Sequence, residues 1–114
     1  MTKGKIVLVP FPFDDLSSTK VRPAVCLTDP IGSHHHVVLA FITSQAPSDL
    51  VDSDLVLGSA NTDFSVTGLK GTSTVRLHRL MTVPTSFILR ELGKLPTVMH
   101  EAVDEKLRGL FKLT

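Results

Sequence analysis

The apolar positions of this chain fall into short runs that are separated by polar, turn-forming segments as far as Pro84. Short runs rich in β-branched residues, and bounded by Pro, Gly, Asp and Ser, are typical of β-strands. Four predicted strands follow this pattern: Lys5–Val9, Ala24–Thr28, His36–Ser44 and Leu55–Leu57. The third is the longest and most hydrophobic, so we expect a central strand covered on both faces.

Residues 72–83 differ, because apolar and polar side chains alternate along them. A period of two predicts a strand with one exposed face. Val75 and Leu77 would share one face of this strand, and Arg76 and His78 would share the other.

The pattern changes again after Pro84. Residues 85–92 predict a short helix with a Thr or Ser N-cap, ended by Gly93. Residues 96–113 predict a longer helix, acidic in its first half and basic in its second, which suits the helix dipole. Its apolar positions recur at helical spacing: Met99, Val103, Leu107 and Leu110. Several strands followed by helices predict a mainly β fold, a small antiparallel barrel or half-barrel closed by C-terminal helices.

Composition narrows the classes of protein that remain. The 114 residues fit a single domain over residues 1–114, and 42% hydrophobic residues suffice for a core. A formal net charge of +1 excludes a polybasic nucleic-acid binder, so an RNA or DNA site must be a local patch. No apolar stretch reaches the length of a membrane span, and we interpret the N-terminal apolar run as a strand. We expect a cytoplasmic protein without membrane association.

Two sequence features admit more than one interpretation. Cys26 lies inside an apolar run, which favours a buried small side chain over a reactive thiol, and a single cysteine fits a reducing cytosol. The run His34–His36 suggests a metal site, but adjacent residues on an extended chain point to opposite faces and no second ligand cluster stands out. We therefore predict a polar hairpin tip there, with no metal and no cofactor.

Arg22 stands directly before Pro23, at the entrance of a predicted strand. Proline disfavours the helical conformation of the residue before it, so Arg22 is held extended. A guanidinium can donate two parallel hydrogen bonds to a phosphate. Arg22 is therefore either a phosphate ligand at the rim of the barrel or a plain surface arginine. Thr43 and Ser44 could donate to a phosphate oxygen or simply cap their strand.

Three segments, in order, resemble the MazF/PemK toxins of bacterial toxin–antitoxin pairs. They are GKIVLVPFPFDDLSSTKVRPAVCL, VVLAFITSQ and GLKGTSTVRLHRLMTV, and the later LGKL with its acidic-then-basic helix also fits this family. Each motif alone is weak, whereas the ordered set is fairly specific and spans nearly the whole chain. The resemblance implies an SH3-like barrel that forms a homodimer. It also implies a ribosome-independent, sequence-specific endoribonuclease that a small antitoxin neutralises.

The resemblance also assigns residues. The family's catalytic arginine and threonine match Arg22 and Thr43, with Ser44 a weaker candidate. Some members place an arginine and an aspartate, both linked to cleavage or binding, where this chain has Arg76 and His78. The histidine puts a carboxylate base in doubt, but its imidazole could itself be the base or acid. A half-exposed strand histidine is the alternative.

Metal-independent cleavage of single-stranded RNA needs a group that takes the 2′-OH proton, a cation for the transition state and a donor for the leaving 5′-oxygen. The expected products are a 2′,3′-cyclic phosphate and a 5′-hydroxyl. Lys20, Lys70 and Arg79 would add phosphate contacts, or are simply solvated. Three phenylalanines lie in loop-like segments where bases could stack: Phe11, Phe13 and Phe64.

Two other functions stay open, because fold does not fix function. Relatives of this fold inhibit DNA gyrase without catalysis, and a degenerate barrel could bind RNA or antitoxin without turnover. The resemblance implies an antitoxin whose C-terminal segment lies across the RNA groove and blocks Arg22. Operator DNA would be bound only through that antitoxin.

Overall fold

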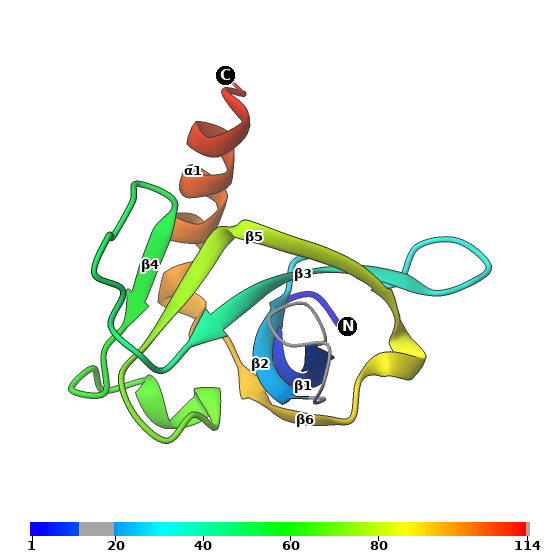
Figure 1. Ribbon diagram of the computed structural model, residues 1–114, viewed down its shortest axis with the longest axis horizontal. Coiled ribbons are helices and arrows are strands. Elements are labelled where there is room, and N and C mark those ends of the chain that lie inside the picture. The colour runs from blue at the N-terminus through cyan, green and yellow to red at the C-terminus, as the bar shows by residue number, and fades with distance from the viewer. Residues whose placement is uncertain (12–19, 114) are drawn as a thin grey trace.

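The computed structural model describes residues 1–11 and 20–113. Its strands form one antiparallel sheet in the order β4-β5-β3-β2-β1-β6, which curls into a half-barrel (Figure 1). The strands are β1 (Lys5–Phe11), β2 (Lys20–Cys26), β3 (His36–Thr43), β4 (Asp54–Leu57), β5 (Ser73–Pro84) and β6 (Arg90–Lys94). The predicted mainly β fold is confirmed, although with one C-terminal α-helix instead of two.

β3 is the central strand that its hydrophobicity predicted. Neighbouring side chains point to opposite faces of a strand, and Leu39 and Ala40 are both fully buried. The two residues belong to separate clusters of core side chains, one on each face of the sheet. Cys26 is buried in the second cluster, where burial raises the pKa of its thiol to about 11. The interpretation of Cys26 as a buried apolar side chain is confirmed.

Helix α1 (His100–Phe111) covers the other core, as the spacing of its apolar residues predicted. Val103 is buried there, and Met99 and Leu107 pack beside it against the β-sheet. A 3₁₀ turn (Thr97–Met99) precedes the helix. No helix in the described part of the chain is long and apolar enough to cross a membrane.

The helix predicted over residues 85–92 is wrong. A single 3₁₀ turn (Thr85–Phe87) leads into β6, which pairs with the open edge of β1. This tertiary pairing satisfies the backbone groups that a helix would otherwise satisfy locally. Gly93 lies inside β6, and a Cβ atom added there would lie 2.2 Å from the carbonyl oxygen of Val66. The glycine therefore permits a close backbone approach and does not end a helix.

β2 begins at Lys20, four residues before the predicted start at Ala24, so Pro23 lies within the strand. Pro23 pairs with Leu8 of β1, whereas the ladder with β3 begins only at Ala24. Proline has no backbone N–H, so it suits a stretch of strand with a single hydrogen-bonded neighbour. β1 extends to Phe11, two residues past its predicted end at Val9, so Phe11 lies in a strand and not in a loop-like segment. Phe13 lies outside the described residues.

β5 is irregular where it passes β3. Ala40 pairs with Leu80, but the next residue, Phe41, pairs with Arg76. Residues 77–79 therefore have no partner in β3, which marks a bulge. Val75 and Leu77 are buried on one face as predicted, but the opposite face is not exposed before the bulge, because Thr74 is buried and Arg76 is only partly exposed.

Candidate functional site

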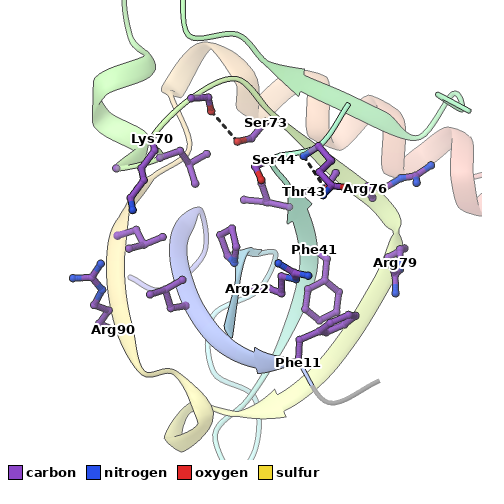
Figure 2. A pocket seen from close by; sticks show the side chains of 18 residues that line it. Phe11, Arg22, Phe41, Thr43, Ser44, Lys70, Ser73, Arg76, Arg79 and Arg90 are labelled. Atoms are coloured by element: carbon purple, nitrogen blue, oxygen red, sulfur yellow. Dashed lines mark hydrogen bonds between the residues drawn. The ribbon is translucent and has the colours of Figure 1, made fainter. Parts of the chain in front are cut away.

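A cavity of about 480 Å³ opens where β2 and β3 separate (Figure 2). The first pair of the β2–β3 ladder is Ala24 with Phe41. Continuing that antiparallel register by two residues would set Arg22 opposite Thr43, but no such pair forms. Both side chains instead line the cavity. The unpaired ends of β2 and β3 therefore both contribute to the lining, which also includes residues of β1, β5, β6 and the segment 68–71.

The lining of the cavity is strongly cationic. Its described residues include five of the chain's twelve Lys and Arg residues and no Asp or Glu. The five are Arg22, Lys70, Arg76, Arg79 and Arg90. A concave surface lined by one sign of charge attracts polyanions, even though the whole chain is nearly neutral.

Arg22 is fixed through its backbone and exposed at its side chain. Its strand position pairs with Val9, and Pro23 follows it. No hydrogen bond or ion pair joins its guanidinium to another described residue. Figure 2 shows the guanidinium among the side chains near the middle of the cavity. Arg22 can therefore offer its hydrogen-bond donors to an anion without breaking an internal pair.

Thr43 is the last residue of β3, and its hydroxyl has a structural partner. The Thr43 Oγ1 atom accepts a hydrogen bond from the backbone N–H of Gln45 at 3.2 Å. This contact caps the end of the strand, which was the alternative interpretation of Thr43 in the sequence. The hydroxyl hydrogen is not used in that contact, so the group can also donate into the cavity. Ser44 lines the same wall and is exposed.

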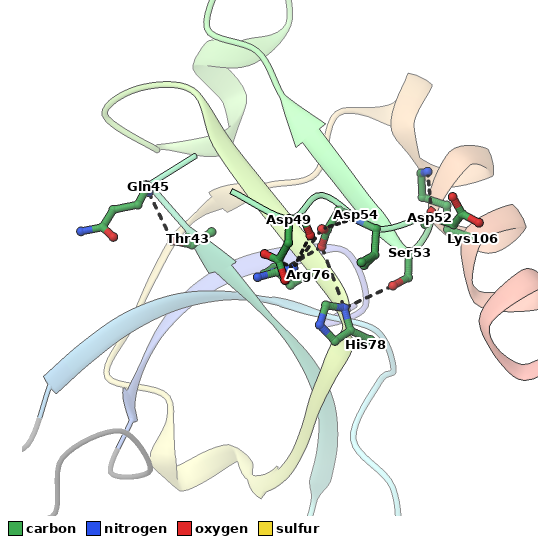
Figure 3. A network of polar contacts seen from close by, with 10 residues as sticks. Thr43, Gln45, Asp49, Asp52, Ser53, Asp54, Arg76, His78 and Lys106 are labelled. Carbon is green, nitrogen blue, oxygen red and sulfur yellow. Dashed lines mark hydrogen bonds and ion pairs between the residues drawn. The ribbon is translucent and has the colours of Figure 1, made fainter. Parts of the chain in front are cut away.

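Arg76 also lines the cavity, but a carboxylate holds its guanidinium (Figure 3). Asp54 lies opposite it in the β4–β5 ladder and accepts hydrogen bonds from its Nε at 3.0 Å and its Nη2 at 3.1 Å. Asp49 stands farther away, at 3.8 Å. The side chain of Asp54 is 1% exposed and that of Arg76 is 16% exposed. Most of the positive charge of Arg76 is therefore already balanced.

The ionisation of Asp54 follows from these contacts. Burial is the largest single effect and opposes ionisation, but it is outweighed by the hydrogen bond from Arg76, the backbone N–H of Val51 and nearby positive charge. The pKa of Asp54 is therefore lowered from its usual value. The hydrogen bond to Asp54 in turn raises the pKa of Arg76. Sequence reasoning missed Asp54, because its only signal was an acid at the start of a short strand.

His78 lies on the Asp54 side of β5 and does not line the cavity. Its Nδ1 atom is 3.2 Å from the hydroxyl oxygen of Ser53 and 3.9 Å from an Asp54 carboxylate oxygen. Lys20 is exposed and is also absent from the lining. The structure therefore brings six of the eight predicted site residues to one cavity: Arg22, Thr43, Ser44, Lys70, Arg76 and Arg79.

The aromatic residues of the cavity form part of its wall. The rings of Phe11 and Phe41 meet edge to face, 4.1 Å between centroids. The guanidinium of Arg79 lies 5.3 Å from the centroid of Phe11, a cation–π distance. Phe64 instead packs against the core. Arg90 lines the cavity too, and sequence reasoning missed it because it fell in the segment predicted to be a helix.

The histidine run lies at the other end of β3 from Thr43, at the hairpin tip between β2 and β3 (Figure 1). The eight residues of β3 separate the two ends by about 23 Å at the usual rise of a strand. All three histidines are exposed, as a polar tip predicts. Among the described residues, no group of three or more His, Cys, Asp and Glu side chains could hold a metal ion.

Comparison with solved structures finds the same fold in several toxins. The Mycobacterium tuberculosis toxin MazF-mt6 is 22% identical, with a TM-score of 0.73 over 96% of this chain and 98% of that one. MazE–MazF from Deinococcus radiodurans is 18% identical, with a TM-score of 0.75 over 100% and 97%. A mycobacterial endoribonuclease in complex with its cognate antitoxin is 13% identical, with a TM-score of 0.74 over 100% and 97%. A search of the curated proteins finds no match.

A match to a family model assigns the chain to a family from its sequence. Residues 2–111 match the family described as PemK-like, MazF-like toxin of type II toxin-antitoxin system. The match includes every strand, the cationic cavity between β2 and β3, and helix α1. The chain therefore belongs to the PemK/MazF-like toxins of type II toxin–antitoxin systems.

Proposed function

We propose that this toxin is a sequence-specific endoribonuclease that cleaves single-stranded RNA in the cavity between β2 and β3 without a metal ion. The observation that carries the proposal is the meeting of Arg22 and Thr43 in a cavity with five cations and no carboxylate in its described lining. Family membership supports the same activity, since one of the similar structures is described as an endoribonuclease.

In this proposal, Arg22 binds the scissile phosphate through two guanidinium donors. The charge on the phosphate oxygens increases as the ribose 2′-oxygen attacks, so a fixed cation stabilises the transition state more than the ground state. Thr43 donates its hydroxyl hydrogen to a nonbridging oxygen and so orients the phosphate. The bond that forms joins the 2′-oxygen to phosphorus as the 2′-hydroxyl proton passes to water, and the bond to the 5′-oxygen breaks as that oxygen takes a proton from water. The products are a 2′,3′-cyclic phosphate and a 5′-hydroxyl.

The proposal does not give His78 the role of base or acid in the cavity. Its imidazole faces Ser53 and Asp54 instead of the cavity. Asp54 holds Arg76 at the rim, where the paired guanidinium contributes less charge to RNA binding than Arg22 does. Ser44 and Arg79 would contact the strand beside the scissile phosphate, because both line the cavity.

The same proposal includes partners. Two of the similar structures are complexes of a toxin with its antitoxin, so we infer that a cognate antitoxin neutralises this toxin. An acidic antitoxin segment laid across the cavity would cover Arg22 and compete with RNA. The toxin would act as a homodimer in the cytoplasm, and operator DNA would be bound through the antitoxin.

The test is a digest of a long single-stranded transcript by the purified protein in excess chelator, with the cut sites mapped. Cleavage should persist, leave cyclic phosphate ends, and stop when the nucleotide 5′ to the cut is 2′-deoxy. Arg22→Gln should lower the cleavage rate about 10²–10³-fold, as for removal of one transition-state donor. Arg108→Gln is the matched control, because Arg108 lies on α1 away from the cavity and pairs with Glu105.

Other results would overturn the proposal in distinguishable ways. Cleavage that requires a divalent ion would reject the metal-independent mechanism. Inhibition of DNA supercoiling by gyrase with RNA left intact would favour the gyrase alternative. RNA binding without turnover would show a degenerate barrel.

A further inference from the structure

Two cations of the cavity lie on the wall opposite Arg76 and Arg79. Lys70 comes from the segment that leads into β5, and Arg90 begins β6 at the edge of the sheet (Figure 2). These segments are 20 residues apart in the chain. Both side chains are exposed, and neither is joined by a hydrogen bond or ion pair to another described residue.

The two segments are held together by their backbones. A Cβ atom added to Gly68 would lie 2.0 Å from the carbonyl oxygen of Leu92, and one added to Gly93 would lie 2.2 Å from that of Val66. The positive φ of +70° at Gly68 also favours glycine. This double close approach joins the chain just before Lys70 to β6, so the curl of the sheet gathers both cations at one rim.

The acid nearest to Arg90 in sequence does not neutralise it. Glu91 forms an ion pair with Lys5 at 2.9 Å, and Glu91 does not line the cavity. The backbone of Arg90 is fixed by its pairing with Leu8, and the preceding Leu89 N–H donates to the Leu8 carbonyl at 2.8 Å. Arg90 is thus a cation on a fixed backbone, unlike Arg76 with its bound carboxylate.

The position of Arg90 separates it from Arg22. Arg90 pairs with Leu8, and Leu8 pairs with Pro23, the residue beside Arg22. Two strand spacings, about 10 Å, therefore lie between the backbones of β6 and β2. A strand whose scissile phosphate is bound by Arg22 would bring a neighbouring phosphate to this rim.

We propose that Lys70 and Arg90 form a second phosphate subsite that holds a backbone phosphate next to the scissile one. This inference rests on the proposed nuclease function and deepens it. The subsite binds the ground state and the transition state alike, because its phosphate does not react. Its loss therefore raises KM more than it lowers kcat.

The experiment uses a synthetic oligonucleotide with the mapped cut sequence and a series in which one flanking phosphate at a time is a neutral methylphosphonate. Arg90→Gln should raise KM about five- to tenfold, the loss expected for one charge-assisted contact. It should also reduce the slope of log KM against log salt by about 0.7. One methylphosphonate that weakens the wild type should have a much smaller effect on Arg90→Gln. Lys94→Gln, on the same strand but outside the cavity, is the matched control.

Each further outcome has a definite meaning. The subsite is rejected if Arg90→Gln and Lys94→Gln have the same KM. It is also rejected if every methylphosphonate weakens Arg90→Gln as much as it weakens the wild type. In both cases the proposed nuclease function is unaffected. A loss in kcat instead of KM would place Arg90 at the scissile phosphate and also reject the subsite. If the wild type cuts no RNA, the nuclease and the subsite fail together. Arg90→Lys, which keeps the charge, should restore most of the binding, and thermal melting should show that each variant folds.

Discussion

Replacing Asp54 by asparagine tests the polar network on β4 and β5 most sharply. The carboxylate accepts two hydrogen bonds from Arg76 and one from the backbone N–H of Val51. Asparagine has nearly the same shape but only one acceptor oxygen, and its NH₂ group would face a donor. The substitution thus removes the negative charge and at least one charge-assisted bond while leaving the strand intact.

The magnitude follows from the burial of the pair. A hydrogen bond to a charged group is worth about 1.5–3 kcal/mol, and removing one partner of a fully buried ion pair costs about 3–5 kcal/mol. Asp54 is 1% exposed, but Arg76 at 16% retains some contact with water. We therefore expect Asp54→Asn to lower the free energy of unfolding by about 2–3 kcal/mol. At about 4 °C per kcal/mol for a chain of this size, Tm should fall by roughly 8–12 °C.

The assay is urea unfolding followed by circular dichroism, with Asp49→Asn as the matched control. The carboxylate of Asp49 stands 3.8 Å from the same guanidinium but is 78% exposed. Its loss should change the free energy of unfolding by less than about 0.5 kcal/mol. Equal effects of the two substitutions would refute the conclusion that Asp54 is the stabilising partner of Arg76.

Three further predictions follow from burial and backbone geometry. Because the pKa of Asp54 is lowered in the folded state, its contribution to the free energy of unfolding is present above about pH 4 and is lost as the pH falls through its folded pKa. The difference in free energy of unfolding between wild type and Asp54→Asn, measured in urea, should therefore shrink on acidification. A difference that stays constant with pH would contradict this. Cys26, with a pKa of about 11 and full burial, should resist iodoacetamide at pH 8 until urea unfolds the chain, and rapid native labelling by mass spectrometry would contradict its burial. Gly93→Ala should lower Tm strongly, because the added Cβ atom would clash with the Val66 backbone. Gly109→Ala, within α1 and with open space around it, should instead stabilise the folded protein by about 0.5–1 kcal/mol. Similar melting curves for the two variants would refute the close backbone approach at Gly93.

The sequence predicted the parts of the fold that depend on local pattern. The period of two over residues 72–83 and the hydrophobicity of His36–Ser44 identified β5 and β3, because burial of apolar side chains decides those elements. The helix predicted over residues 85–92 was wrong, because pairing with the open edge of β1 outweighs the local helical pattern of this segment and forms β6. Such a pairing between distant segments has no signature within the segment itself.

The candidate site was predictable in its centre and not at its rim. Arg22 was singled out from the proline that follows it, and Thr43 from its place at a strand end and from the family resemblance. Both line the cavity, and their chemical roles stay predictions. Asp54 and Arg90 were missed, since their roles arise from strand register and from the curl of the sheet. His78 was misplaced for a similar reason. Its imidazole lies beside Ser53 and Asp54, in the stretch of β5 that has no partner in β3, and not in the cavity lining.

The most direct test of the account is a double-mutant cycle on Arg22 and Thr43 in single-turnover RNA cleavage. The substitutions are Arg22→Gln and the nearly isosteric Thr43→Val. If both side chains act on one phosphate across the gap between β2 and β3, the double variant should lose far less than the product of the two single losses, with a coupling of about 1–3 kcal/mol. Losses that multiply to within about 0.3 kcal/mol would show that the two residues act independently, and would contradict a shared cleavage site in this cavity.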